Sequence, residues 1–166
     1  MSEAEQPRHR LTPDEFREVV GHFASGVTVV TTALGGRPLG TTASAFTSLS
    51  LEPPMVVVCM NRDSDTGKAV LETGMMAVNI LGEDQADLAV HFAQHGVDKF
   101  AGIELSPGEH GQPLLAEAVA SLVCRVTEHI SAATHFVFLA EVDEATASGG
   151  APLTYFRGRF GRIALD

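Results

Sequence analysis

The sequence predicts a mainly β domain with peripheral helices, arranged as a closed or partly closed barrel of mostly antiparallel strands. About six or seven segments are rich in β-branched and apolar residues, and about two or three have helical periodicity. Many β segments follow one another through short turns, which favours antiparallel pairs. Closing the sheet would also remove its exposed edges. The length of 166 residues favours one domain at 12–166, after a flexible tail at 1–11.

The first expected element is a helix that begins after Thr12. Thr12 is the predicted N-cap, Pro13 takes the first helical position, and Glu15 completes a capping box. Apolar residues then recur at the spacing of one helical face, so we expect this face to be buried. We expect Ser25-Gly26 to end the helix. The apolar face consists of Phe16, Val19, Val20 and Phe23.

The remaining elements are predicted from β-forming runs, helical periodicity and turn signals. In chain order they are strands at 27–33, 38–46 and 55–60, a helix at 64–72, a strand at 75–81, a helix at 83–95, and strands at 118–130, 134–145 and 153–163. Gly35-Gly36 indicates a hairpin turn between the first two strands, and Gly74 is the stop signal of the second helix. The run at 55–60 is wholly apolar, so we expect it to be buried on both faces. In the third helix, Leu88 and Phe92 should face inward.

Composition and charge exclude several classes of function. The net charge of −10 argues against nucleic acid or an anionic membrane as a partner. Apolar residues make up 45% of the chain, and part of that share is expected at a subunit interface. No apolar run is long enough to span a membrane, and the polar N-terminus lacks the apolar core of a signal peptide, so we expect a cytoplasmic protein.

Cysteine usage and short motifs narrow the classes further. Cys59 and Cys124 lie inside apolar runs, which predicts buried, reduced thiols in the cytoplasm. No CxxC or HExxH spacing occurs, so no metal site is expected. The chain also has neither a GxGxxG fingerprint nor a P-loop, so a Rossmann or P-loop nucleotide site is not expected.

The segment from Gly40 to Pro54, GTTASAFTSLSLEPP, carries the most specific signal for a ligand. It is rich in small hydroxyl residues and almost free of charge. Small hydroxyl groups beside accessible backbone suit a planar ligand with polar edges and a phosphate tail, which indicates a flavin. The residues that fit the edge of the isoalloxazine ring are Thr41, Thr42, Ala43 and Ser44, and Ser48 is placed to reach the ribityl chain. The alternative is that these are ordinary strand residues, because threonine is a good β former.

The predicted helix at 64–72 offers an anion site. The N–H groups at a helix start and the positive end of its dipole favour a phosphate. Asp63 and Asp65 should then point away from it. A plain N-cap at Ser64 is the alternative. Lys99 is expected to place a positive charge near the flavin phosphate or pyrimidine edge, or else to be a solvated surface lysine.

Several motifs, in their order and spacing, resemble the short-chain flavin reductase family. They are FASGVTVVTT, GTTASAFTSLSLEPPMVVV, SDTGKAVLETGMMAVNIL, HFA, DKFAG and YFRGRFGRI. The resemblance extends from about Phe16 to Ile163. It implies an FMN-binding split barrel of the Greek-key type, a homodimer, FMN or FAD as flavin, and NADH or NADPH as co-substrate. It also implies a partner monooxygenase that receives the reduced flavin.

The resemblance implies roles for residues of the flavin site. The segment Thr41 to Ser44 would line the flavin ring. Ser64 and Thr66 would hold the flavin phosphate, with Asn61 nearby.

The resemblance also implies roles on the nicotinamide side. His135 matches a family histidine that contacts the nicotinamide cofactor, but Ala133-Thr134 replace the Gly-Asp that usually precede it. Tyr155, Arg157 and Arg159 should alternate onto one face of the last strand, which borders the active site in the family. Tyr155 would stack near the nicotinamide, and an arginine would pair with a cofactor phosphate.

The sequence therefore predicts an NAD(P)H:flavin oxidoreductase that transfers a hydride from the nicotinamide to the flavin. One alternative is a flavin-binding electron carrier or complex component with little NAD(P)H turnover, and the residues Ala133-Thr134 motivate it. Another is a related barrel that oxidises a small substrate with bound FMN, in the manner of pyridoxamine-phosphate oxidases. The order of the motifs favours the reductase.

Overall fold

Three sheets and three helices make up residues 10–164, the part of the chain that the computed structural model describes. The helices are α1 (Pro13–Val20), α2 (Asp65–Thr73) and α3 (Ala86–Ala93). The strands are β1 (Ser25–Gly26), β2 (Thr28–Leu34), β3 (Arg37–Ala43), β4 (Phe46–Leu51), β5 (Pro54–Asn61), β6 (Met75–Ile80), β7 (Leu105–Pro107), β8 (Pro113–Leu115), β9 (Ala120–Ala132), β10 (His135–Ala147), β11 (Thr154–Phe156) and β12 (Arg159–Gly161). Most of the predicted tail at 1–11 lies outside the described residues.

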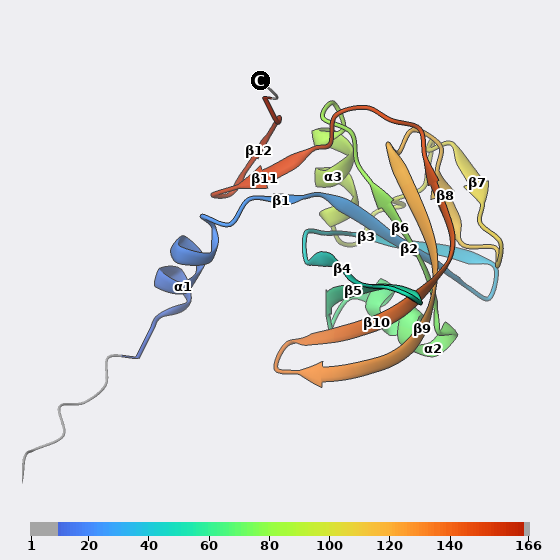
Figure 1. The fold of residues 1–166 in the computed structure, drawn as a ribbon, viewed down its shortest axis with the longest axis horizontal. Helices are drawn as coiled ribbons and strands as arrows, with labels where there is room; N and C mark the ends of the chain where they lie inside the picture. The colour runs from blue at the N-terminus through green and yellow to red at the C-terminus, as the bar shows by residue number, and fades with distance from the viewer. Residues whose placement is uncertain (1–9, 165–166) are drawn as a thin grey trace, which may run out of the picture.

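The largest sheet has seven strands in the order β3-β2-β6-β9-β10-β5-β4 and curls into a barrel (Figure 1). All of its pairings are antiparallel, as the short connections predicted. The two edge strands, β3 and β4, follow each other in the chain and are joined only by Ser44 and Ala45. No ladder pairs these two strands within the described residues, so the barrel is split there. The predicted split, mostly antiparallel barrel is confirmed.

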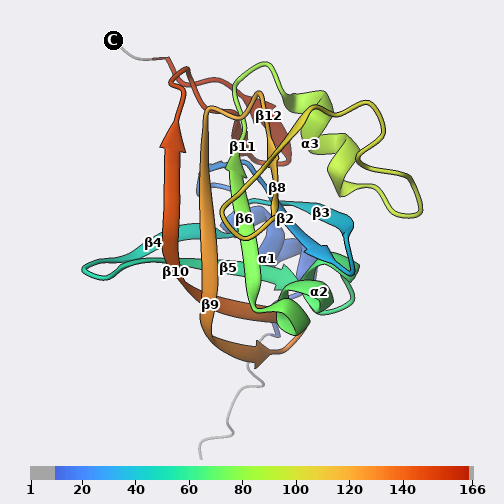
Figure 2. The same cartoon turned by 90° about the vertical axis from the view of Figure 1, so that its right-hand side faces the viewer.

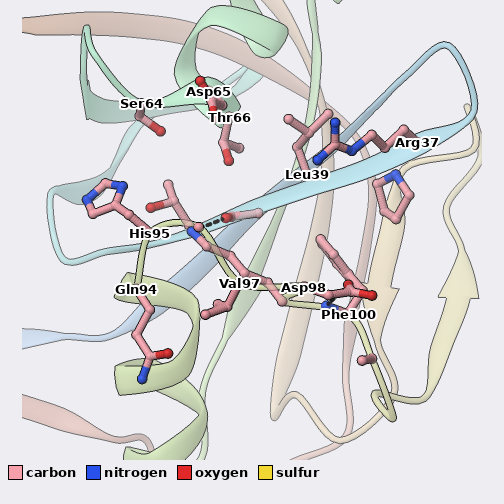
Figure 3. Close-up of a pocket in the computed structure, with 16 residues that line it drawn as sticks. Arg37, Leu39, Ser64, Asp65, Thr66, Gln94, His95, Val97, Asp98 and Phe100 are labelled. Carbon is pink, nitrogen blue, oxygen red and sulfur yellow. Dashed lines mark hydrogen bonds between the residues drawn. The ribbon is translucent and has the colours of Figure 1, made fainter.

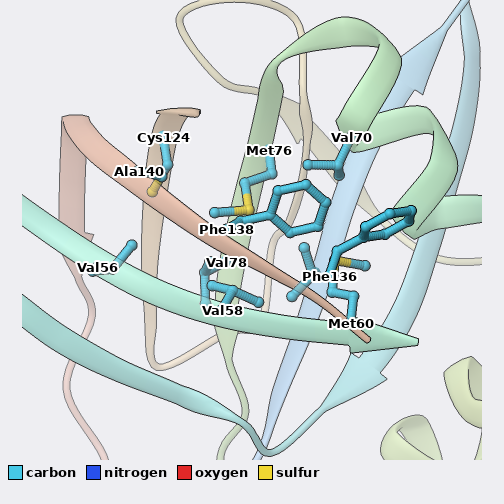
Figure 4. Close-up of a cluster of buried hydrophobic side chains, with 11 residues drawn as sticks. Val56, Val58, Met60, Val70, Met76, Val78, Cys124, Phe136, Phe138 and Ala140 are labelled. Carbon is cyan, nitrogen blue, oxygen red and sulfur yellow. The ribbon is translucent and has the colours of Figure 1, made fainter. Parts of the chain in front are cut away.

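The barrel interior holds the main hydrophobic core (Figure 4). Strand β2 contributes to two cores, because Val30 points into the barrel while Val29 packs in a second cluster with Phe92 of α3. The prediction that Phe92 faces inward is confirmed. Strand β5 differs from the prediction, since its residues alternate between buried and half-buried positions. No described helix makes extensive contact with β5, so its run is not buried on both faces.

Local sequence patterns correctly predicted the two-residue turn between β2 and β3 and the second helix. Gly35 and Gly36 have φ angles of 59° and 79°, the left-handed values that a tight hairpin between β2 and β3 requires. Ser64 caps α2, and Gly74 ends it with a φ of 68°. The third helix is shorter than predicted, at Ala86–Ala93. Within residues 10–164, no helix is both long enough and apolar enough to cross a membrane.

Helix α1 has the predicted capping box but not the predicted burial. The Thr12 N–H donates to Glu15 Oε2 at 2.8 Å, and the Glu15 N–H donates to Thr12 Oγ1 at 3.3 Å. The helix ends at Val20 with Gly21 as its C-cap, and the predicted end, Ser25-Gly26, forms β1 instead. The apolar residues are exposed by 55% (Phe16), 67% (Val19), 46% (Val20) and 83% (Phe23). The reason is that α1 projects from the barrel on an arm with β1, β11 and β12 (Figure 1).

The predicted last strand at 153–163 is two short strands, β11 and β12, that form a hairpin. Its turn consists of Arg157 and Gly158, with φ angles of 48° and 78°. Tyr155, Arg157 and Arg159 therefore do not alternate along one strand, and that prediction is wrong. The chain reverses at Arg157 because both turn residues adopt positive φ, which suits the twist of a hairpin.

Candidate functional site

A pocket of about 750 Å³ lies between β3, the N-terminus of α2 and the loop at 94–101 that follows α3 (Figure 3). Four residues that the sequence singled out line it together. They are Thr41, Ser64, Thr66 and Lys99. The first comes from β3, the next two from the start of α2, and Lys99 from the loop after α3. Residues far apart in the sequence therefore form one cavity.

A tight turn fixes the start of α2 beside this pocket. Asn61 Oδ1 accepts a hydrogen bond from the Asp63 N–H at 2.8 Å, and Ser64 Oγ accepts one from the Gly67 N–H at 3.3 Å. A Cβ on Gly67 would lie 3.0 Å from the Asn61 carbonyl oxygen, so glycine allows the close approach. The first turn of a helix leaves N–H groups without acceptors, and this turn faces the cavity.

Thr66 is the residue of this turn that points most clearly to a ligand. Its side chain is only 3% exposed, yet its hydroxyl makes no hydrogen bond to any residue in 10–164. Figure 3 shows the Thr66 side chain directed from α2 into the pocket. Although most of the residue is buried, its hydroxyl oxygen remains accessible from the pocket, where a ligand or water can pair with it. The N-terminus of α2 thus has the donors that an anion such as a phosphate needs.

Lys99 joins the loop at 94–101 to the barrel. Its Nζ donates to the carbonyl oxygens of Gly40 at 3.0 Å and Phe92 at 2.8 Å. Burial lowers the pKa of Lys99, and the negative charge of Asp65 partly offsets that shift. Lys99 thus lies half-buried at the pocket, and its predicted role beside the flavin stays a prediction. Asp65 also lines the pocket, and the expectation that it points away from a bound phosphate stays a prediction.

The edge position of β3 gives a planar ligand access to backbone groups. In an antiparallel pair, every second residue turns its N–H and C=O away from the partner strand. Thr41 lines the pocket, whereas Thr42 Oγ1 donates to the Ala89 carbonyl of α3 at 2.6 Å. Ala43 packs against the barrel core, and its carbonyl accepts from Thr28 Oγ1 at 2.7 Å. The hydroxyl of Thr42 is therefore already hydrogen-bonded. Thr42 and Ala43 could contact a ligand only through backbone groups.

A second cleft of about 600 Å³ lies between α1 and the β11–β12 turn. It gathers three further residues from the sequence prediction, which are Ser44, Tyr155 and Arg157. The Arg157 N–H donates to the Gly21 carbonyl at 2.9 Å, which holds the turn against the end of α1. Ser44 directly follows β3, so the strand that borders the first pocket runs toward this second cleft.

The remaining predicted residues line neither cavity. Ser48 lies within β4 beside a register shift, not near a strand end. Asn61 and His135 are direct partners in the β5–β10 ladder, at the far end of β5. His135 is exposed, and the Thr134 hydroxyl approaches its ring. The predicted site residues thus lie in the pocket, in the second cleft and at the β5–β10 end, except for Thr42 and Ala43 in β3 and Ser48 in β4.

Sequence reasoning missed Arg37, which lines the pocket at the start of β3. The signal for it was its nearness to Thr41 in the same strand and not alternation, because all the residues at 37–41 line the pocket. His95 and Asp98 were also missed. They lie in a loop whose position over β3 depends on tertiary contacts. Within residues 10–164, no group of three potential metal ligands comes close enough to hold an ion.

The fold is a split antiparallel barrel, and its pocket lies between a helix start and a free sheet edge, an arrangement that suits an anionic, planar ligand. The chain belongs to the family described as "Flavin reductase like domain", which matches residues 20–164. It is 55% identical over 153 residues to the reductase component of a 4-nitrophenol 4-monooxygenase/4-nitrocatechol 2-monooxygenase from Rhodococcus opacus, covering 92% of this chain and 82% of that protein. It is 39% identical over 173 residues to an NADH-dependent FAD reductase from Streptomyces globisporus, covering 99% of this chain and 92% of that protein.

Solved structures show the same fold. The NADH:FAD oxidoreductase SgcE6 of Streptomyces globisporus C-1027 has a TM-score of 0.87 and 38% identity, covering 96% of this chain and 100% of that chain. The same protein in complex with NAD and FAD fragments also has a TM-score of 0.87, with 38% identity over 95% of this chain and 98% of that chain. The flavin reductase PheA2 has a TM-score of 0.87 and 33% identity, covering 93% of this chain and all of that chain, 100%.

Proposed function

We propose that the chain is an NAD(P)H-dependent flavin reductase that supplies reduced flavin to a partner monooxygenase. The observation that carries the proposal is the Thr66 hydroxyl at the start of α2, which has no hydrogen-bond partner among residues 10–164 and faces a pocket beside the free edge of β3. Membership of the flavin reductase-like family supports it. So do the names of the relatives, one a monooxygenase reductase component and one an NADH-dependent FAD reductase.

The pocket suits the flavin part of FMN or FAD. Ser64 and Thr66 would hold the phosphate at the helix start, with Asn61 shaping the turn. The flavin ring would lie along the edge of β3 from Thr41 toward Ser44, a distance of roughly 10 Å at the rise of a strand. Lys99 would add positive charge near the phosphate or the pyrimidine edge.

The second cleft suits the nicotinamide nucleotide. Tyr155 has an aromatic face there, and Arg157 has a guanidinium without an ion pair among the described residues. His135 lines neither cavity of the single chain, so we propose that it meets the nicotinamide nucleotide across a dimer. Hydride transfer from nicotinamide C4 to flavin N5 is chemistry that the two cofactors supply. The residues of the chain would bind and orient the two cofactors so that their reacting atoms can meet, and would exclude water.

The same proposal includes a homodimer. The exposed apolar residues of the arm form a surface larger than scattered single residues would make. They are Phe16, Val19, Val20 and Phe23 around α1, with Phe156 and Phe160 in the adjoining hairpin. Two free thiols, Cys59 and Cys124, are consistent with a cytoplasmic location.

The electron-carrier alternative rested on the loss of a carboxylate before His135. Thr134 Oγ1 lies 2.8 Å from His135 Nδ1, so a hydrogen bond at that nitrogen is retained. This contact favours the reductase. The family match does the same against an oxidase of the pyridoxamine-phosphate type.

The decisive test is to mix the purified protein with NADH, and separately with NADPH, in the presence of FMN or FAD. We expect oxidation of the reduced nicotinamide that depends on both protein and flavin. The rates with each pair identify the preferred cofactors. A protein that binds flavin but oxidises neither nucleotide is instead an electron carrier.

A further inference from the structure

We propose that Arg37 binds the second phosphate of a dinucleotide flavin and thereby makes the chain prefer FAD to FMN. This inference deepens the proposed function and rests on it. It assigns a ligand-discriminating role to a residue at the start of β3. The argument compares the three places in the pocket that can receive negative charge.

The first place is the start of α2. The hydroxyl of Thr66, which has no hydrogen-bond partner among residues 10–164, and the N–H groups of the first turn face the pocket. This place fits one phosphate, the one that FMN and FAD share. It cannot tell the two flavins apart.

The second place is Lys99. Two of the three N–H donors of its ammonium are already used by the carbonyl oxygens of Gly40 and Phe92. Asp65 lies close enough to interact electrostatically with Lys99. This side chain therefore fastens the loop to the barrel and has little left for a second phosphate.

The third place is Arg37. Its side chain is exposed and makes no hydrogen bond or ion pair with any residue in 10–164. The acidic residues that line the same pocket are Asp65 and Asp98, and Asp98 Oδ1 accepts from the Phe100 N–H at 3.2 Å instead. Figure 3 shows the guanidinium of Arg37 lying back along β3, over Leu39 and toward the α2 side of the pocket. All five of its N–H donors are thus available.

The pocket has room for more than one phosphate. It measures about 750 Å³ and opens between the α2 start and the strand that carries Arg37. In FAD, the second phosphate is bonded directly to the first, so it would lie just beyond the α2 site. A guanidinium binds phosphate oxygens through two parallel hydrogen bonds. FMN has no second phosphate, so Arg37 gains nothing from it.

The experiment measures the affinities of the purified protein for FMN and FAD by the change in flavin fluorescence on binding. The variants are Arg37→Ala and Arg37→Lys, with Arg125→Ala as the control. Arg125 has the same charge, is half exposed on β9, and pairs with Asp143 at 3.0 Å, away from the pocket. This readout does not depend on NAD(P)H turnover.

We expect the unaltered chain to bind FAD more tightly than FMN, and this preference to shrink as salt is added. Arg37→Ala should raise the dissociation constant for FAD about tenfold while leaving that for FMN within about twofold. Arg37→Lys should restore part of the preference, because a lysine keeps the charge but not the paired geometry. Arg125→Ala should change neither affinity.

Two results would overturn the role of Arg37. One is an equal loss of FMN and FAD affinity in Arg37→Ala, which would mean that Arg37 acts on the part that both flavins share. The other is an unaltered FAD affinity in that variant. If the unaltered chain binds neither flavin, the proposed function itself fails, and that outcome is separate from the first two.

Discussion

Thr134 Oγ1 lies 2.8 Å from Nδ1 of His135, so the imidazole ring forms a hydrogen bond with the hydroxyl group of the preceding residue. The histidine begins β10 at the turn from β9, and Asn61 lies directly across from it on β5. A hydrogen bond at Nδ1 orients the ring and leaves Nε2 for another partner. The contact shows how this chain positions the histidine without the aspartate that the resemblance would place there.

The first prediction concerns this pair. His135→Ala should raise the KM for the reduced nicotinamide nucleotide about tenfold, and Thr134→Val should raise it by about two- to fivefold, because the ring loses its orienting hydrogen bond. Flavin affinity, measured by fluorescence, should not change. Thr134→Ser is the control that keeps the hydroxyl. Unchanged nicotinamide kinetics in His135→Ala would remove His135 from the site.

The second prediction concerns backbone strain in the same turn. Ala133 has a φ of 49°, a left-handed value that glycine adopts more easily than alanine. Ala133→Gly should therefore stabilise the protein by about 0.5–1 kcal/mol. Ala132→Gly, one residue earlier in the extended strand β9, should destabilise it by a similar amount. Denaturant titration measures both, and a loss of stability in Ala133→Gly would contradict the strain argument.

The third prediction separates the two thiols. Burial, with a smaller contribution from the charge of Asp143, raises the pKa of Cys124 to about 12. Cys124 therefore stays protonated and unreactive at ordinary pH, since the thiolate is the reactive form. Cys59 is only partly buried, so a thiol reagent should label the native protein at Cys59 alone. Cys59→Ser should abolish the labelling, and Cys124→Ser should not. Equal labelling of both thiols in the native protein would show that the core opens.

The fourth prediction tests the start of α2. Thr66→Val removes the hydroxyl that faces the pocket but keeps the shape of the side chain, so packing around this buried residue would be largely preserved. Loss of a hydrogen bond to a charged phosphate should raise the dissociation constants of both FMN and FAD about tenfold. The equal effect on both flavins distinguishes this site from Arg37. If neither affinity changes, the phosphate lies elsewhere.

The fifth prediction tests the arm as a dimer contact. Phe23 is 83% exposed in the single chain, so Phe23→Ser should leave the fold of each subunit intact. We expect a marked shift from dimer to monomer, measured by sedimentation. Val90→Ser is the control, because Val90 is 49% exposed but belongs to α3, outside the apolar residues of α1 and its hairpin. If the protein without substitutions sediments as a monomer, the proposed dimer is refuted.

The features that the sequence predicted well depend on neighbouring residues. The capping box at Thr12 and the cap and stop of α2 at Ser64 and Gly74 are local hydrogen-bond and backbone requirements. The glycine pair between β2 and β3 is equally local. The antiparallel pairing of the barrel strands followed from their short connections, and the length of a connection can also be read directly from the sequence.

The features that it missed depend on distant parts of the chain or on backbone strain. Periodicity found the apolar face of α1, but it cannot say whether that face meets its own barrel or another surface. The break of the last strand at Arg157 was hidden, because a non-glycine residue takes a positive φ there. The link from Lys99 to Gly40 spans 59 residues, and no short-range pattern predicts that the loop at 94–101 closes over β3.

The free edges of β3 and β4 have a consequence for hydrogen exchange (Figure 2). Outward amides on edge strands have no ladder partner, so they should be among the first in the barrel to exchange with deuterium. A ligand seated against β3 would slow that exchange at individual residues. The pattern of slowed amides would trace the outline of the bound molecule along the strand, even for a ligand that leaves no colour and undergoes no reaction.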